Sequence, residues 1–479
     1  MRGKKKYHIG LIILFTGYQL LASGQGTPDK NIRPDSLALA DSSFFIVGDI
    51  TISGNKRTKA NIILREIPFR SGEEFPMTEL VNKLEDARRL LMNMSLFNQV
   101  VVAARNFEGN KVNIIVTLKE RWYLFPVPYF RPVDRNLNQW IIEQKASLDR
   151  VNYGAKVLYY NATGRNDKLK FYFIGGYTKQ LSFSYDRLYI DKKLKWGMNL
   201  GFAIGKNREV TYNTINNKQV FVKDNDHFLR HFTNANLELT YRNAIKTRHR
   251  IGFRYTLEEV SDTIRTLNPA FFKKAGTRVE YPGIFYSMSY FDLDFNPYPT
   301  KGYAADFSIG KDGLNNSINV WQLSARGSGS WHLSPKTFFN LNVFGSIKLP
   351  FTQPYFMQRF LGYGETFMQG YEYYVIDGVA GGYLKTTLTR ELLNFSIRIP
   401  AKKGKEPQRI PFRIFGKTYG NAGYVHNPQP GENFLSNKML YSGGFGIDIL
   451  TFYDVTFKFE YSFNQLGQNG LFLHRKSIF

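Results

Sequence analysis

The sequence predicts a mainly β protein, with one small α+β domain followed by a sixteen-stranded antiparallel transmembrane β-barrel. Three observations support this prediction. The chain starts with an export signal, it contains no apolar run long enough for a spanning helix, and from Trp122 onward apolar and polar residues alternate in short segments. Aromatic content is 16% although mean hydropathy is only −0.33. Composition alone would also fit a large soluble β protein, and only the order of the residues favours the membrane barrel.

The first 24 residues are predicted to be a secretory signal peptide. A basic start containing Arg2 is followed by the apolar stretch Ile9–Leu21 and by the small residues Ala22-Ser23-Gly24. The apolar stretch is too short to cross a bilayer as a helix. Residues 25–43 are polar and without periodicity, and we expect a flexible leader there. Export leaves the periplasm, the outer membrane or the outside as the location.

Charge and cysteine content limit the classes of partner and of covalent attachment that we expect for this protein. The 64 Lys and Arg residues exceed the 39 Asp and Glu residues, which gives a net charge of +25. Export argues against nucleic acid, so anionic outer-membrane lipid or lipopolysaccharide is the more plausible counterpart. The chain has no cysteine, and therefore no lipid-anchor site and no disulfide.

Residues 44–120 are predicted to form a small domain with the order β-α-α-β-β. Its first strand ends at the turn Ser53-Gly54-Asn55, and Thr58 and Thr78 open two helices with apolar residues at helical spacing. Two alternating strands follow. The exposed edges of so small a sheet suit the addition of a strand from a partner protein.

Residues 121–479 are predicted to form the barrel. Short connections after even-numbered strands and long ones after several odd-numbered strands indicate periplasmic turns and outer loops, respectively. The sixteen expected strands are 121–131, 151–163, 168–177, 181–190, 194–205, 228–242, 248–260, 283–296, 302–310, 317–332, 337–349, 379–398, 410–426, 440–450, 454–464 and 470–479.

The longest interruption, 350–378, falls on the outer side between the eleventh and twelfth strands. It contains many aromatic residues, which favours burial over a solvated loop. We therefore expect this loop to fold back into the barrel lumen.

Residues of the small domain resemble those of a POTRA domain. They are Gly54-Asn55 with Thr58, Gly72, Leu96-Phe97 with Val100, and Glu120. The whole chain looks like the BamA/TamA family of outer-membrane assembly and translocation proteins. That resemblance implies an outer-membrane protein with its POTRA domain in the periplasm.

The family carries an Arg-Gly-Phe/Tyr motif at the tip of the lumen loop. The matching residues here are Gln369-Gly370-Tyr371, preceded by Leu361-Gly362. The barrel-wall acids that the motif arginine meets in the family align with Asn421 and, less securely, with Ser396. The thirteenth-strand match runs from Phe415 to Gly423.

Neutral residues thus stand where the resemblance implies an arginine and its carboxylates. Removing one partner of a semi-buried ion pair leaves the other charge without a partner, which destabilises the protein. Replacing both partners can leave the stability nearly unchanged. We therefore predict a hydrogen bond between the amides of Gln369 and Asn421, contributing about 1 kcal/mol. The alternative is that the aromatic residues alone hold the loop.

The first and last strands suggest a weak closure. Pro126 and Pro128 are two residues apart in the first strand, so one edge of this strand lacks two N–H donors. If that edge faces the last strand, Gly470–Phe479, the seam could open sideways for a client strand. The alternative is that the prolines only mark the linker from the first domain.

No enzyme signature is present. The sequence has no Gly-x-Ser-x-Gly elbow and no phosphate-binding loop, and its seven histidines do not form a cluster. We therefore expect no catalysis, no cofactor and no metal.

The leading hypothesis is an outer-membrane insertase or a protein translocase. Its clients would be unfolded outer-membrane or secreted proteins, and periplasmic chaperones or accessory subunits would bind the POTRA domain. The alternative is a passive or plugged pore, or a structural subunit without insertase activity.

Overall fold

A computed structural model describes residues 44–133, 139–272, 276–399 and 408–476. The predicted signal peptide, the leader and Phe479 lie outside these ranges. Within the described ranges, no helix is both long enough and apolar enough to cross a membrane.

The N-terminal domain has two helices on a four-stranded sheet of order β2-β1-β4-β3, in which β1 and β4 are parallel. The predicted element order is present, with a three-residue strand added before the second helix. In that helix Leu80, Ala87 and Leu91 share a stripe and are buried against the sheet. The elements are β1 (Phe44–Ser53), α2 (Ala60–Leu64), β2 (Glu74–Pro76), α3 (Met77–Asn93), β3 (Phe97–Glu108) and β4 (Lys111–Glu120).

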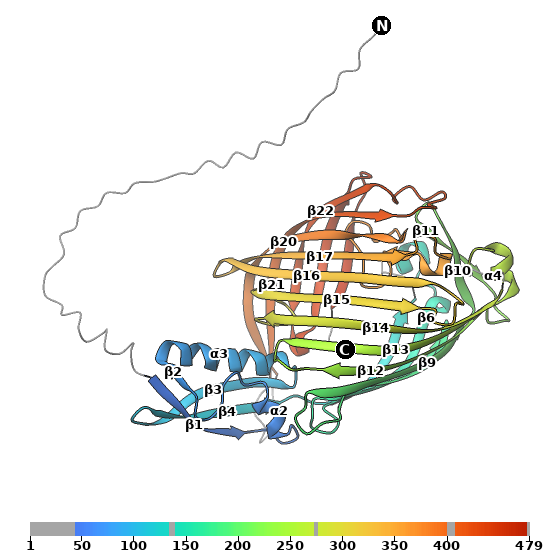
Figure 1. Cartoon of the computed structure of the whole chain (residues 1–479). Coiled ribbons are helices and arrows are strands. Elements are labelled where there is room, and N and C mark those ends of the chain that lie inside the picture. Colours follow the sequence, from blue (N-terminus) through green and yellow to red (C-terminus); the bar gives the residue numbers. More distant parts are fainter. Residues whose placement is uncertain (1–43, 134–138, 273–275, 400–407, 477–479) are drawn as a thin grey trace, which may run out of the picture.

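The rest of the chain forms a sixteen-stranded antiparallel sheet that curls into a barrel (Figure 1). Each of the sixteen predicted segments overlaps one of its strands. The strands are β5 (Leu124–Pro132), β6 (Val151–Tyr160), β7 (Lys168–Gly176), β8 (Thr178–Tyr189), β9 (Trp196–Asn207), β12 (Arg230–Tyr241), β13 (Thr247–Val260), β14 (Arg278–Leu293), β15 (Gly302–Asp312), β16 (Val320–Ser334), β17 (Thr337–Leu349), β20 (Ala380–Ile399), β21 (Gln408–His426), β22 (Met439–Leu450), β23 (Thr456–Asn464) and β24 (Asn469–Lys476).

Side-chain alternation gives the barrel an apolar outer wall. Along β15, Tyr303, Phe307 and Ile309 point outward and are exposed, while the even-numbered residues from Ala304 to Ser308 face the lumen. Near the periplasmic turns, Trp331 donates a hydrogen bond from Nε1 to the Tyr303 hydroxyl (2.9 Å) and stacks on Phe339. Such aromatic clusters mark the membrane interface.

The long outer connections contain structure of their own, which the sequence did not predict. Buried residues from several of them form one apolar cluster, centred on Ile264, Phe271 and Tyr355, over the outer end of the barrel. The additional elements are β10 (Glu209–Ile215), β11 (Lys218–Lys223), α4 (Asp262–Leu267), β18 (Arg359–Leu361), β19 (Ile376–Asp377), the π-turn Gln139–Glu143 and the 3-10 turns Leu148–Arg150, Tyr355–Met357 and Phe452–Asp454.

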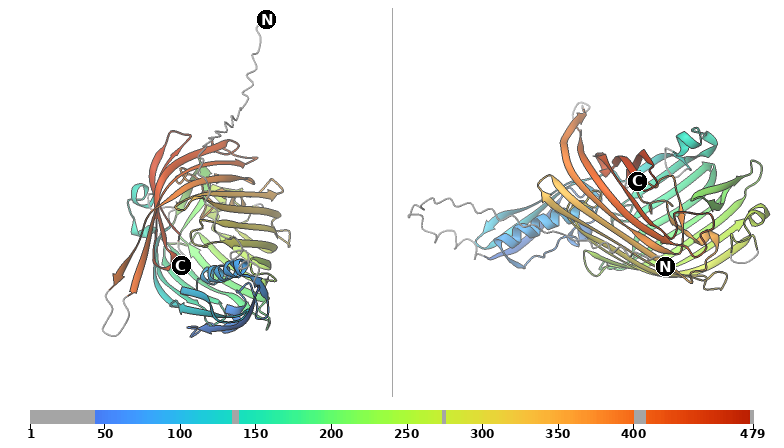
Figure 2. Two further views of the ribbon diagram at one scale, coloured as in Figure 1. Left: turned by 90° about the vertical axis from the view of Figure 1, so that its left-hand side faces the viewer. Right: turned by 90° about the horizontal axis from the view of Figure 1, so that it is seen from above.

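The N-terminal domain lies against the opposite rim of the barrel (Figures 1 and 2). Leu194, from the β8–β9 turn, is buried in the core of that domain. Arg89 of α3 forms an ion pair with Asp292 of β14 at 2.9 Å. Asn161 donates a hydrogen bond from Nδ2 to the Thr58 hydroxyl at 2.9 Å. Apolar and polar contacts together fix the domain under the periplasmic mouth of the barrel.

Candidate functional site

The loop between β17 and β20 packs inside the barrel wall. Its buried residues form a cluster with wall residues such as Tyr383, Val425 and Leu440; the loop members are Phe360, Leu361, Met368, Tyr371, Tyr374 and Ile376. Gly362 turns the chain with φ +86°, and a Cβ there would lie 2.3 Å from the Tyr374 carbonyl oxygen. That close approach explains why glycine follows Leu361.

The tip of the loop rests on β22 and β23. The Gly370 carbonyl accepts a hydrogen bond from Asn464 Nδ2 at 2.7 Å, and the Tyr371 hydroxyl donates to the Tyr441 carbonyl at 3.0 Å. A Cβ on Gly370 would lie 3.0 Å from the Phe463 carbonyl oxygen and 3.0 Å from Ser442 Cβ. The Gly370 backbone and the Tyr371 hydroxyl, rather than the side chain at position 369, therefore position the tip.

The predicted hydrogen bond between Gln369 and Asn421 is not formed. Asn421 Nδ2 donates instead to the Ser442 hydroxyl at 3.1 Å. Within the described residues, Gln369 Oε1 and Asn421 Oδ1 are both buried without a hydrogen-bond partner. A bond in either direction would need one of these oxygens, so the two amides do not replace the family's ion pair.

Two other predicted docking residues lie elsewhere. Phe415 is fully buried, but it stacks on Tyr298 of the β14–β15 turn at 4.5 Å, in a cluster separate from the loop. Ser396 pairs with Pro411 and is exposed, because the β20–β21 hairpin extends past the ends of its neighbours. Gly423 does face the loop, where a Cβ would meet Met368 Sδ.

A buried charge network, which no local sequence pattern indicates, links four neighbouring strands of the wall beside the loop tip. Lys417 Nζ of β21 lies 2.6 Å from Asp448 Oδ1 of β22 and 2.6 Å from Glu460 Oε1 of β23. Glu460 Oε2 lies 2.5 Å from His474 Nδ1 of β24, and Nε2 of the same ring is 3.8 Å from Glu372 of the loop. His474 of the last strand therefore lies between an acid of the wall, Glu460, and an acid of the loop, Glu372.

Aromatic contacts reinforce the link between the loop and the last strand. Phe367 stacks on the His474 ring at 4.8 Å, and Tyr373 meets Phe472 edge-on at 5.3 Å. Lys385 Nζ of β20 lies 4.5 Å from the centroid of the Phe367 ring. The sequence signal for this site is the basic run His474-Arg475-Lys476 after the apolar residues Leu471–Leu473 of the last strand.

The two terminal strands of the barrel sheet, β5 and β24, are not paired with each other in the described residues. Tyr160 N donates to the Tyr123 carbonyl and Val133 N to the Arg150 carbonyl, both at 2.9 Å. The register from β5 to β6 has no shift, so odd-numbered residues of β5 bond to β6 and even-numbered ones face the free edge. Pro126 and Pro128 therefore remove their donors from the edge that faces the seam.

The periplasmic end of the seam is bridged by side chains. Arg121 forms an ion pair with Asp454 at 2.8 Å, and Phe125 of β5 packs edge-on against Tyr453 at 5.5 Å. Gly470 lies at the start of β24, opposite Ser462 of β23. The seam is thus held at its rim by the β22–β23 turn rather than by a ladder along its length.

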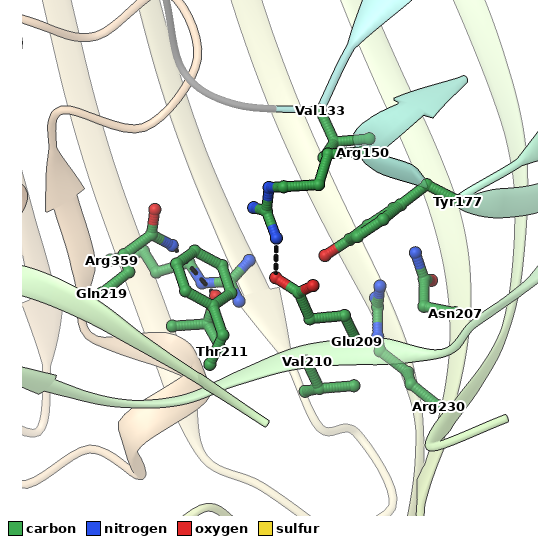
Figure 3. A pocket seen from close by; sticks show the side chains of 11 residues that line it. Val133, Arg150, Tyr177, Asn207, Glu209, Val210, Thr211, Gln219, Arg230 and Arg359 are labelled. Carbon is green, nitrogen blue, oxygen red and sulfur yellow. Dashed lines mark hydrogen bonds and ion pairs between the residues drawn. The ribbon is translucent and has the colours of Figure 1, made fainter. Parts of the chain in front are cut away.

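A cavity of about 190 Å³ lies among the outer connections (Figure 3). Arg150 crosses it to form an ion pair with Glu209 of β10, and its guanidinium also lies over the rings of Tyr177 and Phe221. These contacts connect the β5–β6 connection to the β10–β11 hairpin. The cavity therefore belongs to the outer connections that cover this end of the barrel.

Substituting Gly370 with alanine should weaken loop docking. Gly370 and Gly364 both have positive φ, +88° and +60°, but a Cβ on Gly364 meets nothing within 4 Å. Gly364→Ala should therefore cost only the backbone strain of about 1–2 kcal/mol. Gly370→Ala should cost a further ~1–3 kcal/mol for overpacking against the wall. The readout is the rate at which protease cuts the loop in the folded protein; equal rates for the two variants would contradict the docked tip.

Comparisons with known proteins agree with this geometry. The family model for POTRA, surface antigen variable number repeat, matches residues 45–121. The outer membrane protein assembly factor BamA of Neorickettsia risticii (strain Illinois) is 28% identical over 209 residues, which cover 36% of this chain and 27% of that protein. The matched stretch thus spans about a quarter of the relative's length.

Solved structures are similar over most of the chain. CdiB from Escherichia coli has a TM-score of 0.51 at 8% identity, covering 90% of this chain and 75% of that one. BamA from Haemophilus ducreyi lacking POTRA domains 1–3 has a TM-score of 0.48 at 16% identity, covering 90% and 84%. The likeness to CdiB supports the fold.

The fold and the POTRA match together define an outer-membrane β-barrel with a POTRA domain in the periplasm. Within that class the combination of one POTRA domain, in the described residues, with a sixteen-stranded barrel is of the BamA/TamA type.

Proposed function

We propose that this protein assembles β-barrel clients into the outer membrane, or passes client proteins across it, by opening its seam sideways. The observation that carries the proposal is the edge of β5 that no strand pairs in the described part of the chain, on which Pro126 and Pro128 remove two donors. A ladder with fewer hydrogen bonds costs less to open and leaves an edge on which another strand can pair. The named activity of the BamA relative is consistent with this proposal.

The lumen loop would hold the seam ready for opening. It contacts β24 through Phe367, Glu372 and Tyr373. Movement of β24 would therefore have to break or carry along these contacts. In this proposal the loop stabilises the last strand while β5 is free to move, and no bond-making chemistry is involved.

The POTRA domain would deliver clients or bind periplasmic chaperones and accessory subunits. β3 is a terminal strand of the POTRA sheet, and its outer edge is unpaired within the described residues. An extended segment of a partner could add to this edge through main-chain hydrogen bonds.

A plugged pore or structural subunit is the second candidate. The apolar cap over the outer end and the tightly packed loop favour it, because both obstruct the lumen.

Depletion of the protein followed by quantification of the outer-membrane proteome separates the candidates. We expect many barrel proteins to fall together if the protein is a general insertase, and one client to fall if it is a dedicated translocase. An unchanged proteome with altered solute permeability would contradict the proposal and support the pore.

A further inference from the structure

The β20–β21 hairpin extends beyond the barrel wall. The ladder of β20 with β17 ends at Arg390, and the ladder of β21 with β22 starts at Arg413. Beyond these residues the two strands pair only with each other in the described residues. The stretch from Glu391 to Ile399 alone adds roughly 27 Å at the usual rise per residue of a strand. Both views in Figure 2 show this orange-red hairpin leaving the barrel sideways.

The hairpin carries an apolar face that is continuous with the lipid-facing side of the barrel. Leu384 and Leu388 point outward on β20, level with the wall. A bulge at Leu392 then shifts the register by one residue, so that the outward positions pass from even-numbered to odd-numbered residues. The shift places Leu393, Phe395 and Ile397 on the same outward face, where 44–56% of each residue is exposed.

The other strand completes this face. Phe412 of β21 stacks on Phe395 at 5.5 Å, and Ile414 is opposite Leu393. The opposite face is polar, with Ser396 and with Asn394 beside the ion pair of Glu391 and Arg413. The hairpin is therefore amphipathic over a stretch in which no neighbouring strand covers it.

The position of the hairpin identifies what would cover the apolar face. Leu388 pairs with Phe339, which belongs to the aromatic cluster at the periplasmic interface, so the hairpin begins where the hydrocarbon ends. A strand pair that bends outward at this level turns its lipid-facing side toward the membrane surface. The described stretches 390–399 and 408–413 also hold four basic residues and one acidic residue. Apolar side chains flanked by cations are the composition of elements that lie in a lipid interface.

We propose that the β20–β21 hairpin lies on the periplasmic leaflet of the outer membrane, with Leu393, Phe395 and Ile397 among the lipid chains and its basic residues on anionic phospholipid headgroups. It would anchor the C-terminal side of the seam to the bilayer, independently of what the seam admits.

Single-cysteine labelling tests this placement, since the chain has no cysteine of its own. Phe395→Cys and, as the matched control on the opposite face, Ser396→Cys are labelled with an environment-sensitive fluorophore in the full-length protein. The protein is reconstituted in phosphatidylcholine vesicles with and without phosphatidylglycerol, and heat-modifiable migration in gels verifies folding. We expect blue-shifted emission at position 395 that spin-labelled lipids quench several-fold more than emission at position 396.

Equal exposure of the label to water at both positions would overturn the proposal. A label at position 395 that is shielded from water but not quenched by spin-labelled lipid would also overturn it, because protein rather than lipid would then cover the apolar face. Replacing Arg390 and Arg398, two exposed basic residues of β20, together with glutamine tests the charge component. The gain in quenching on adding phosphatidylglycerol should be lost; a gain that persists would overturn the assignment of the headgroups.

Discussion

Replacing Lys417 with methionine is expected to destabilise the barrel by about 3–5 kcal/mol, the usual cost of removing one partner from a buried ion pair. The Lys417, Asp448 and Glu460 side chains are 4%, 3% and 1% exposed, so neither carboxylate can regain water when the ammonium is lost. His474 contacts the same Glu460 carboxylate, so a displaced Glu460 should also disturb the contacts of His474 with the loop. The measurement is the temperature at which the folded barrel loses its compact gel migration.

Two controls make this experiment specific. Lys336→Met removes an exposed cation from a periplasmic turn and should have almost no effect on the transition temperature. Combining Lys417→Met with Asp448→Asn and Glu460→Gln also removes the two carboxylate charges that would lose their partner. The triple variant should therefore recover much of the lost stability. A single variant as stable as the unmodified protein would mean that the network does not support the wall.

Replacing Glu66 with glutamine is expected to loosen the POTRA domain from the barrel by a similar ~3–5 kcal/mol. Glu66 lies between Arg65 and Arg242, whose Nη2 is 2.7 Å from Glu66 Oε2. The measurement is hydrogen exchange of the barrel turn that carries Arg242, which should speed up. Glu79→Gln is the matched control: Glu79 forms an exposed helix pair with Lys83, worth no more than ~0.5 kcal/mol.

Acid should have the same effect as that substitution. Burial raises the pKa of the Glu66 carboxyl, but the hydrogen bonds and charges of Arg242 and Arg65 outweigh burial and lower the pKa from its ordinary 4.5 to about 2. A lowered pKa stabilises the docked state above pH 4.5, and this contribution is lost as the pH falls toward 2. Exchange in the turn should therefore accelerate over that range in the unmodified protein and much less in Glu66→Gln. Identical pH profiles would contradict the role of Glu66.

The strands were predictable because alternation is a local property of the sequence. All sixteen follow from the period-two pattern, which a lipid-facing wall imposes on every strand. The POTRA elements follow from helix caps and turn residues in the same way. The β10–β11 hairpin was missed since it pairs away from the barrel sheet and its sequence was assigned to a long outer loop.

The contacts of the candidate site were less predictable, because they depend on which residues meet across the lumen. The family resemblance predicted a hydrogen bond between Gln369 and Asn421, but Asn421 donates its hydrogen bond to Ser442 instead. Ser396 does not face the loop because it lies in the part of the β20–β21 hairpin that extends past the ends of the neighbouring strands. Glu372 and His474 are 102 positions apart, and no local pattern indicates that they meet.

The most direct test of the account is a tether across the seam. Cysteines replacing Phe130 of β5 and Leu471 of β24, both exposed on the outer wall, are joined in cells by a reducible bis-maleimide linker. The control joins Phe130→Cys to Tyr153→Cys, which are already paired between β5 and β6. The account predicts that the seam tether lowers the levels of client outer-membrane proteins, that reduction restores them, and that the control tether leaves them unchanged. Client levels that do not fall with the seam tether in place would contradict sideways opening.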